Sequence, residues 1–261
     1  MRVEDITDRK YPSIYADELA TKARAVLRER GLRTLPVVDE IKRLLGVITR
    51  NDMMAITSSV SPIRVEGIMS TPRLIATPDM DARSVMRKML HLDEWYVPVV
   101  KSSQNKTYNG MFGLENFISA YSKKETSGLS TPINKVMSTE LFVCSVNDEV
   151  DNVWRTMQEK SFSGCPVVSK GKIVGILTQA NLLESSMVFP VFEAKKGRFK
   201  SPSKISSIMK VPVISLKPTN TVKDAAELML KKGIGRVPVV DRKGKLVGIV
   251  DREDIVRALI K

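Results

Sequence analysis

The 261-residue chain has few of the residues that build metal sites, disulfides and histidine-dependent active sites. It contains one histidine, His91, and two cysteines, Cys144 and Cys165, which do not form a C-x-x-C pair. A zinc site or a Ser-His-Asp triad needs more of these residues, and isolated cysteines are typical of small buried hydrophobic positions. A Gly-x-x-x-x-Gly-Lys-Ser/Thr phosphate loop is also missing from the sequence. We therefore expect a protein that is not an enzyme and has no obligatory cofactor or metal.

Long apolar runs are missing as well. No stretch approaches the roughly 18 residues that a membrane helix needs, and the first residues, Met1 to Asp5, lack the apolar segment of a secretory signal. Hydrophobic residues make up 43% of the chain and charged residues 27%, a composition typical of globular proteins. We expect a cytoplasmic protein that does not associate with membranes.

The charge is strongly positive. Lys and Arg number 42 against 29 Asp and Glu, which gives a net charge of +13. Such an excess favours anionic partners, namely nucleotides, acidic protein surfaces or nucleic acid, but does not choose among them.

One short pattern occurs four times along the chain. An apolar strand containing proline is followed by a turn and by a second apolar strand that contains glycine. The proline strands read Leu-Pro-Val-Val-Asp at 35–39, Val-Pro-Val-Val-Lys at 97–101, Cys-Pro-Val-Val-Ser at 165–169 and Val-Pro-Val-Val-Asp at 237–241, and the glycines are Gly46, Gly110, Gly175 and Gly248. A repeat of this kind predicts a chain built from several copies of one structural unit.

The fourth copy shows the secondary structure of the unit most clearly. Apolar residues at helical spacing over 222–229 run into Lys-Lys-Gly at 231–233, a basic last turn with a glycine cap. Two β-branched runs and a final amphipathic helix follow. A further strand is expected before the first helix, at 213–216 here and at 141–145 in the third copy. The unit is therefore β-α-β-β-α, and proline within a strand predicts a position at the edge or start of the sheet.

A unit of this size, about 55 residues, buries too little surface to be stable alone. We expect repeats at 1–58, 62–121, 130–187 and 202–261. Polar residues at 122–132 form a linker in the middle of the chain, and a second, basic connector lies near 190–204. These connectors fit a two-plus-two arrangement, in which paired repeats pack sheet to sheet.

These repeats resemble the cystathionine-β-synthase (CBS) domain, an α/β (α+β) unit that occurs in tandem pairs called Bateman modules. Four repeats without an attached enzyme are also similar to the γ subunit of AMP-activated protein kinase and its archaeal relatives. The resemblance implies a flat, pseudo-symmetric disc of two Bateman modules. It also implies a regulatory, energy-sensing role, in which AMP, ADP, ATP or S-adenosylmethionine binds between paired repeats and a partner protein reads the change. That partner would be a second copy of the chain, in a homodimer, or an unidentified regulated protein.

In the family, a Gly-x-x-Thr/Ser-x-x-Asp motif supplies the carboxylate that binds ribose. The first repeat matches it fully at 46–52, so the resemblance assigns Asp52 to ribose and Thr49 to phosphate. The same spacing is also that of a helix N-cap, with Thr49 as the cap and Asp52 at the third helical position.

The other copies of the motif depart from this pattern. The third has Thr178 but carries Asn181 in place of the carboxylate, and the second has no hydroxyl residue at all. The fourth keeps the carboxylate as Asp254 but has Asp251 in place of the hydroxyl residue. Because Asp251 would repel a phosphate, the fourth site is expected to prefer a ligand that has no phosphate or carries it elsewhere. We therefore predict one or two strong sites, in the first and fourth repeats.

The phosphate partners are expected just before the proline strands. Arg33 and Arg236 are the candidates, because a guanidinium can contact phosphate through two hydrogen bonds. Trp95, at an equivalent place, could stack on adenine, although a packing role fits it better. Apolar residues that lead into each first strand are candidates for adenine contact: Ile14, Ile75, Val143 and Ile214.

Two other functions compete with a nucleotide sensor. Nucleic-acid binding would use the basic run in the second connector, although no known nucleic-acid motif accompanies it. That run consists of Lys195, Lys196, Arg198, Lys200 and Lys204. A partner-docking scaffold with degenerate nucleotide sites is the other alternative.

Overall fold

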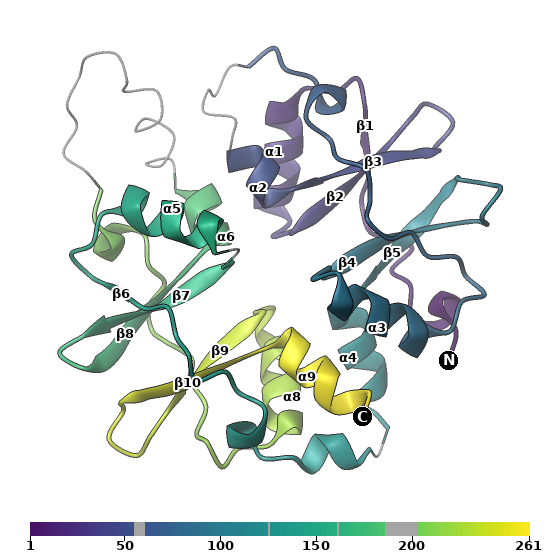
Figure 1. The fold of residues 1–261 in the computed structure, drawn as a ribbon. Helices are drawn as coiled ribbons and strands as arrows, with labels where there is room; N and C mark the ends of the chain where they lie inside the picture. The colour runs from purple at the N-terminus through teal and green to yellow at the C-terminus, as the bar shows by residue number, and fades with distance from the viewer. Residues whose placement is uncertain (55–60, 125, 161, 186–202) are drawn as a thin grey trace, which may run out of the picture.

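A computed structural model describes residues 1–54, 61–124, 126–160, 162–185 and 203–261. Figure 1 shows four small α/β units around a common centre. We number the units repeat 1 to repeat 4 in chain order. The predicted fold class is confirmed: each unit pairs two antiparallel strands with helices on one side.

The elements of repeats 1 and 2 follow each other in the predicted order. Repeat 1 comprises β1 (Ile14–Tyr15), α1 (Ala20–Glu29), β2 (Thr34–Val38), β3 (Leu44–Thr49) and α2 (Arg50–Met54). Repeat 2 comprises α3 (Ala82–His91), β4 (Tyr96–Val100), β5 (Tyr108–Gly113) and α4 (Leu114–Tyr121).

Repeats 3 and 4 have the same plan. Repeat 3 comprises β6 (Cys144–Ser145), α5 (Val150–Glu159), β7 (Gly164–Ser169), β8 (Lys172–Thr178) and α6 (Gln179–Glu184). Repeat 4 comprises α8 (Val222–Lys232), β9 (Arg236–Val240), β10 (Leu246–Asp251) and α9 (Arg252–Leu259). Of the basic connector, Lys195, Lys196, Arg198 and Lys200 lie outside the described residues.

The boundaries of α8 follow from its end residues. The Thr221 hydroxyl accepts a hydrogen bond from the Asp224 backbone N–H at 3.2 Å, and the Asp224 carboxylate accepts one from the Thr221 N–H at 2.8 Å. This reciprocal pair is a capping box. At the other end, Gly233 has φ 62°, a left-handed conformation that glycine adopts without steric cost. The glycine cap predicted after Lys232 is therefore confirmed.

The proline strand is the middle strand in repeats 1 and 3, so the predicted edge position is wrong there. In repeat 1 the sheet order is β1-β2-β3, with Pro36 of β2 opposite Val47 of β3. The parallel neighbour begins only at Ile14, which pairs with Val37. Because no residue of β1 is paired with Pro36, the N–H that proline lacks is not needed for a hydrogen bond to β1.

The strand that precedes each first helix is shorter than predicted. In repeat 3 it covers only β6, two residues of the expected 141–145. In repeat 4 the segment 213–216 keeps one parallel bridge, between Leu216 and Val239. In this bridge, the carbonyl oxygen of Pro238 accepts a hydrogen bond from the Leu216 N–H at 3.0 Å.

Short 3-10 helices link consecutive repeats reciprocally. Each of these helices lies against the neighbouring repeat, where its first N–H donates a hydrogen bond to a loop carbonyl. Two of these hydrogen bonds run from Val3 N to Met80 O at 2.9 Å and from Val65 N to Glu18 O at 2.8 Å. The helices are η1 (Val3–Asp5), η2 (Val65–Gly67), η4 (Ile133–Lys135) and η5 (Ile205–Ser207). Backbone bridges also join the sheets, Arg43 with Thr107 and Lys172 with Lys245. Repeats 1 and 2 thus form one module, and repeats 3 and 4 form another.

The buried core is shared between the modules. One apolar cluster joins repeats 1 and 3, through residues such as Leu27 and Trp154, and the other joins repeats 2 and 4, through residues such as Phe117 and Ile255. Helices of opposite modules therefore face each other in Figure 1, α2 near α6 and α4 near α9. In the described part of the chain, no helix has the length and apolar character needed to cross a membrane.

Candidate functional site

Equivalent residues of the four repeats meet at the centre of the molecule. They lie three positions before each proline and are Arg33, Trp95, Ser163 and Gly235. The guanidinium carbon of Arg33 lies 4.0 Å from the Trp95 ring centroid, and its Nη1 donates to Ser163 Oγ at 3.2 Å. A Cβ atom on Gly235 would lie 2.9 Å from the Trp95 ring. The centre is therefore packed around one indole, and the structure gives Trp95 the packing role.

Arg236 reaches the same point from repeat 4. Its Nη1 donates to Gly164 O at 2.9 Å, and its Nη2 donates to Ser163 Oγ. Burial, together with the positive charges of Arg236 and Arg50, lowers the pKa of Arg33 from its ordinary 12.5 to about 10. Two predicted phosphate partners thus lie together, and their mutual repulsion favours a bound anion.

A cavity, called cavity 1 below, opens beside these arginines and has a volume of about 360 Å³. This is within the range of about 300–1,000 Å³ typical of small-molecule sites. Among the charged side chains of its lining, the cations outnumber a single carboxylate, that of Glu184. The cations are Arg33, Arg50, Lys210, Arg236 and Arg252. A cavity of this charge favours an anionic ligand.

One of these cations has an unused donor. Arg252 is 5% exposed, and its Nη1 lies 2.8 Å from Glu115 Oε2 and donates to the Tyr96 hydroxyl at 3.2 Å. Its Nε is buried and finds no hydrogen-bond partner among the described residues. A buried charged donor without a partner costs free energy, so a ligand atom that accepts from it would bind favourably.

The predicted pair Thr178 and Asn181 lies on the wall of cavity 1. Asn181 Oδ1 accepts from the Thr178 N–H at 3.0 Å and from its hydroxyl at 2.8 Å, so the two residues form a helix cap. Ile214, a candidate for adenine contact, lines the same cavity, together with Ile176. Ile14, by contrast, is buried in the core that joins repeats 1 and 3.

A smaller cavity, cavity 2, is also lined by the central arginines and has a volume of about 260 Å³. Arg33, Trp95, Ser163 and Arg236 line both cavities. Cavity 2 also receives Asp251, whose Oδ1 accepts the N–H groups of Glu253 at 2.9 Å and Asp254 at 3.3 Å.

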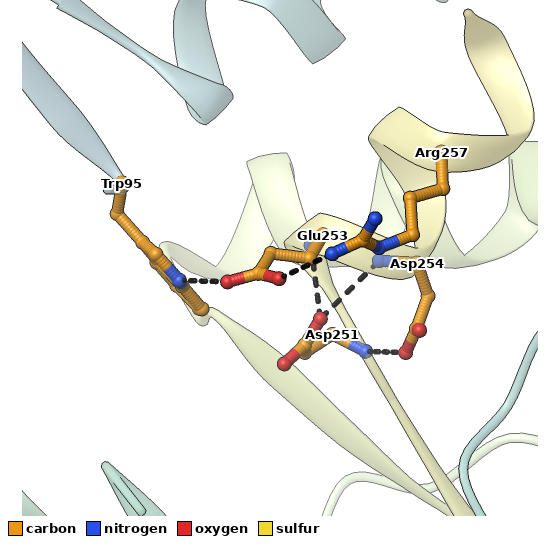
Figure 2. Close-up of polar contacts among 5 residues, drawn as sticks. All are labelled: Trp95, Asp251, Glu253, Asp254 and Arg257. Carbon is orange, nitrogen blue, oxygen red and sulfur yellow. Dashed lines mark hydrogen bonds and ion pairs between the residues drawn. The ribbon is translucent and has the colours of Figure 1, made fainter. Parts of the chain in front are cut away.

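Figure 2 shows this acidic turn at the start of α9. Glu253 Oε1 accepts from the Trp95 indole N–H at 2.7 Å, and Asp254 Oδ2 accepts from the Asp251 N–H at 2.9 Å. Burial, together with the negative charge of Asp251, raises the pKa of Asp254 from its ordinary 3.8 to about 7. Asp254 does not line cavity 2.

Thr49 and Asp52 form a helix cap of their own. Asp52 Oδ2 accepts from the Thr49 N–H at 2.7 Å and from its hydroxyl at 2.8 Å. Neither residue lines the cavities described above. The ligand contact expected of this pair stays a prediction.

Tyr11 contacts residues of both repeats in the first module. Tyr11 stands at the same distance before its proline as Leu141, which lines cavity 2. Its ring centroid lies 5.9 Å from that of Tyr96, and its hydroxyl donates to Thr34 O at 2.7 Å. Burial raises the pKa of Tyr11 well above its ordinary 10. Tyr11 therefore joins the two repeats of the first module, at the position that Leu141 holds in the second module.

Sequence reasoning missed several residues of the two cavities. Arg50 and Arg252 each follow directly after the capping residue of a repeat, and that shared position is the signal that could have revealed them. Glu253 and Lys210 have no such signal, because their places depend on how the repeats pack.

A protein-family model of the CBS domain matches the chain four times, at residues 3–58, 65–123, 133–187 and 205–261. Protein MJ1225 of Methanocaldococcus jannaschii, proposed as an archaeal homolog of γ-AMPK, has a similar crystal structure, with a TM-score of 0.86 and 24% sequence identity. That similarity covers 98% of this chain and 99% of the other.

Two further relatives extend the comparison. An uncharacterised conserved protein of Pyrococcus horikoshii has a TM-score of 0.69 and 21% identity, with 99% of this chain and 100% of the other covered. Uncharacterised protein MJ1426 of Methanocaldococcus jannaschii is 33% identical over 155 residues, which are 49% of this chain and 90% of that protein. These structural similarities concern the fold.

Proposed function

The chain belongs to the CBS-domain family, and from this premise we propose that it is a non-catalytic regulatory protein that binds an adenine nucleotide in cavity 1. The observation that carries the proposal is the set of five cationic side chains around this cavity. Two of them, Arg33 and Arg236, share Ser163 as a hydrogen-bond acceptor. A phosphate between these guanidinium groups would offset their mutual repulsion.

The rest of the cavity suits the other parts of a nucleotide. Ile176, Ile214 and Pro238 give it an apolar wall against which a purine could pack. Thr178 and Asn181 supply polar atoms on the same wall, in reach of ribose hydroxyls. This pose leaves Arg50, Lys210 and Arg252 for further phosphates, as in ADP or ATP.

A ligand in cavity 1 would contact residues from all four repeats. Arg33 comes from repeat 1, Tyr96 from repeat 2, Thr178 from repeat 3 and Arg236 from repeat 4. A ligand that contacts them stabilises one relative arrangement of the two modules, and a ligand can shift an equilibrium by its difference in affinity for two states. We propose that a regulated partner, or a second copy of the chain in a homodimer, reads this arrangement in the cytoplasm.

Isothermal titration calorimetry tests the proposal, with AMP, ADP, ATP and adenosine as ligands. We expect AMP to bind, and the variants Arg33→Met and Arg236→Met each to weaken AMP binding at least tenfold, since a hydrogen bond to a charged group contributes about 1.5–3 kcal/mol. The same variants should weaken the binding of adenosine much less, because adenosine has no phosphate.

Arg242→Met is the matched control, because Arg242 is exposed in the turn between β9 and β10. Its affinity for AMP should equal that of the parent protein. If the folded protein binds none of the four ligands, the proposal is wrong, and the partner-docking scaffold becomes the better account.

A further inference from the structure

The two cysteines of the chain, Cys144 and Cys165, are neighbours in the core that joins repeats 1 and 3. Their sulfur atoms lie 3.3 Å apart, although the residues are 21 positions apart in the sequence. Both thiols are free and buried. A disulfide bond joins sulfur atoms at about 2.0 Å, so an approach of about 1.3 Å would bring this pair to bonding distance.

Neighbouring strands hold the two thiols in place. Cys144 begins β6 and Cys165 lies in β7, and the two strands are parallel, with Cys144 opposite Val167. Cys165 is two positions before Val167, so both thiols are on the same face of the sheet. Next to them, the rings of Phe142 and Phe162 stack with their centroids 5.7 Å apart. The two segments therefore run side by side over both contacts.

A third cavity reaches only one of the two thiols. Cavity 3 has a volume of about 230 Å³ and is lined by Cys144 but not by Cys165. The hydrogen bond with Cys144, together with burial, raises the pKa of the Cys165 thiol. Because the thiolate is the reactive form of cysteine, an oxidant in cavity 3 would react with Cys144 first, and Cys165 would react second.

Carboxylates in the lining of cavity 3 favour an uncharged oxidant. Both Asp148 and Glu149 line the cavity. Lys204 Nζ lies 4.0 Å from Glu149 Oε1 and offsets part of that charge, whereas Asp148 Oδ2 accepts the Ser145 N–H at 2.8 Å. We expect these carboxylates to repel an anionic oxidant such as glutathione disulfide. Hydrogen peroxide is small and carries no charge.

We propose that Cys144 and Cys165 form a reversible disulfide when peroxide enters cavity 3, and that this bond makes ligand binding at the central arginines depend on redox state. First, the Cys144 thiolate attacks one peroxide oxygen, the O–O bond breaks, and a sulfenic acid and hydroxide form. The hydroxide takes up the proton that Cys144 gave up. Next, the Cys165 sulfur attacks the Cys144 sulfur, the S–O bond breaks, and the oxygen leaves as water with the Cys165 proton. The two thiols thus supply the two electrons that reduce peroxide to water.

The disulfide would act on the central arginines through β7. Ser163 Oγ accepts from Arg33 Nη1 at 3.2 Å and also from Arg236, and Gly164 O accepts from Arg236 Nη1 at 2.9 Å. Cys165 follows directly after these two acceptors. A bond to β6 would restrict their movement, and preorganised groups bind a ligand more tightly. We therefore expect AMP to bind more tightly to the oxidised form, a consequence that rests on the proposed function.

Peptide mass spectrometry of the folded protein after treatment with hydrogen peroxide tests the bond directly. We expect the peptides of Cys144 and Cys165 to be joined, and dithiothreitol to separate them. The cross-link should raise Tm by about 5–10 °C, because it closes a loop in the unfolded chain. Dithiothreitol should reverse this rise, which separates it from any effect of methionine oxidation, since a sulfoxide needs its own reductase. Calorimetry should show at least threefold tighter AMP binding in the oxidised form.

Two variants test the order of the reaction. Cys165→Ala should stop at the sulfenic acid of Cys144, which dimedone labels. In Cys144→Ala the remaining thiol should stay reduced. Circular dichroism confirms that both variants are folded, and neither should show a change in Tm that dithiothreitol reverses.

The disulfide is refuted if both thiols of the folded protein stay reduced, if Cys144 is oxidised without a cross-link, or if the cross-link joins two chains. A cross-link that glutathione disulfide produces as fast as peroxide would contradict the preference for an uncharged oxidant. Equal AMP affinities of the two redox forms would overturn the coupling to the arginines. If the cross-link forms and raises Tm but AMP binds to neither form, the proposed function fails while the disulfide stands.

Discussion

Arg33 and Trp95 hold the same position in successive repeats, and the guanidinium carbon of one lies 4.0 Å from the ring centroid of the other. The indole N–H of Trp95 also donates to Glu253 at 2.7 Å. One side chain therefore joins the first, second and fourth repeats, at the point where both cavities meet.

Substitution of Trp95 tests this central contact. Trp95→Phe keeps an aromatic face for Arg33 but leaves Glu253 without its donor, so we expect a loss of about 2 kcal/mol in the free energy of unfolding. Trp95→Leu should cost about 1 kcal/mol more, because the cation–π contact is lost too. Urea denaturation measures both. Equal stability of Trp95→Phe and the parent would show that the hydrogen bond to Glu253 contributes nothing.

Tyr11 allows a test of the contact between repeats 1 and 2 in the first module. Tyr11→Phe removes the hydroxyl that donates to Thr34 O and should cost about 1 kcal/mol. Tyr11→Ala removes the ring as well and should cost about 3–5 kcal/mol. Tyr15→Phe is the control, since Tyr15 is exposed and its change should stay within about 0.5 kcal/mol. If Tyr11→Ala were as mild as this control, the ring would not be a packed part of the contact between the two repeats.

Asp254 predicts a pH dependence of stability. Its pKa in the folded protein, about 7, lies above the ordinary value of 3.8. Between these values the folded state holds more protons than the unfolded state, so the free energy of unfolding should fall as pH rises from about 4 to about 7.

Asp254→Asn should remove this contribution and flatten the curve between pH 4 and 7. The amide can keep the cap, because Asn181 Oδ1 accepts the equivalent N–H in repeat 3 at 3.0 Å. Thermal melts at a series of pH values make the comparison. A variant with the same pH dependence as the parent would mean that another group titrates in this range.

Gly128 tests the packing of the linker between the modules. A Cβ atom there would lie 2.1 Å from the Ala258 carbonyl oxygen on α9, which forces η3 (Ser127–Ser130) to move. We expect Gly128→Ala to destabilise the protein by about 1–3 kcal/mol. Gly67→Ala is the control, since its Cβ would have no neighbour closer than 3.9 Å. Equal effects in the two variants would contradict the close contact.

Much of the fold could be predicted from local patterns. The proline strands, the glycine cap after α8 and the capping pairs all depend on a few neighbouring residues, and they occur in the structure. The shared core could not be predicted in this way, because Trp154 of repeat 3 packs against residues of repeat 1 that are far away in the sequence.

The cavities were harder to predict for a similar reason. The motif at Thr49 and Asp52 is complete, yet cavity 1 lies beside Thr178 and Asn181. The residues that line a cavity depend on how all the repeats pack, since Arg33, Tyr96 and Arg236 reach cavity 1 from repeats other than that of Thr178. A motif within one repeat carries no information about those residues. The two arginines, in contrast, were found from their place before the proline strands.

A crystal structure of the protein with AMP tests the central claim most directly. We predict electron density for AMP in cavity 1, with phosphate oxygens within hydrogen-bond distance of Arg33 and Arg236 and the ribose beside Thr178 and Asn181. Density for the nucleotide beside Asp52 alone, or in cavity 2 with its phosphate next to Asp251, would contradict this account.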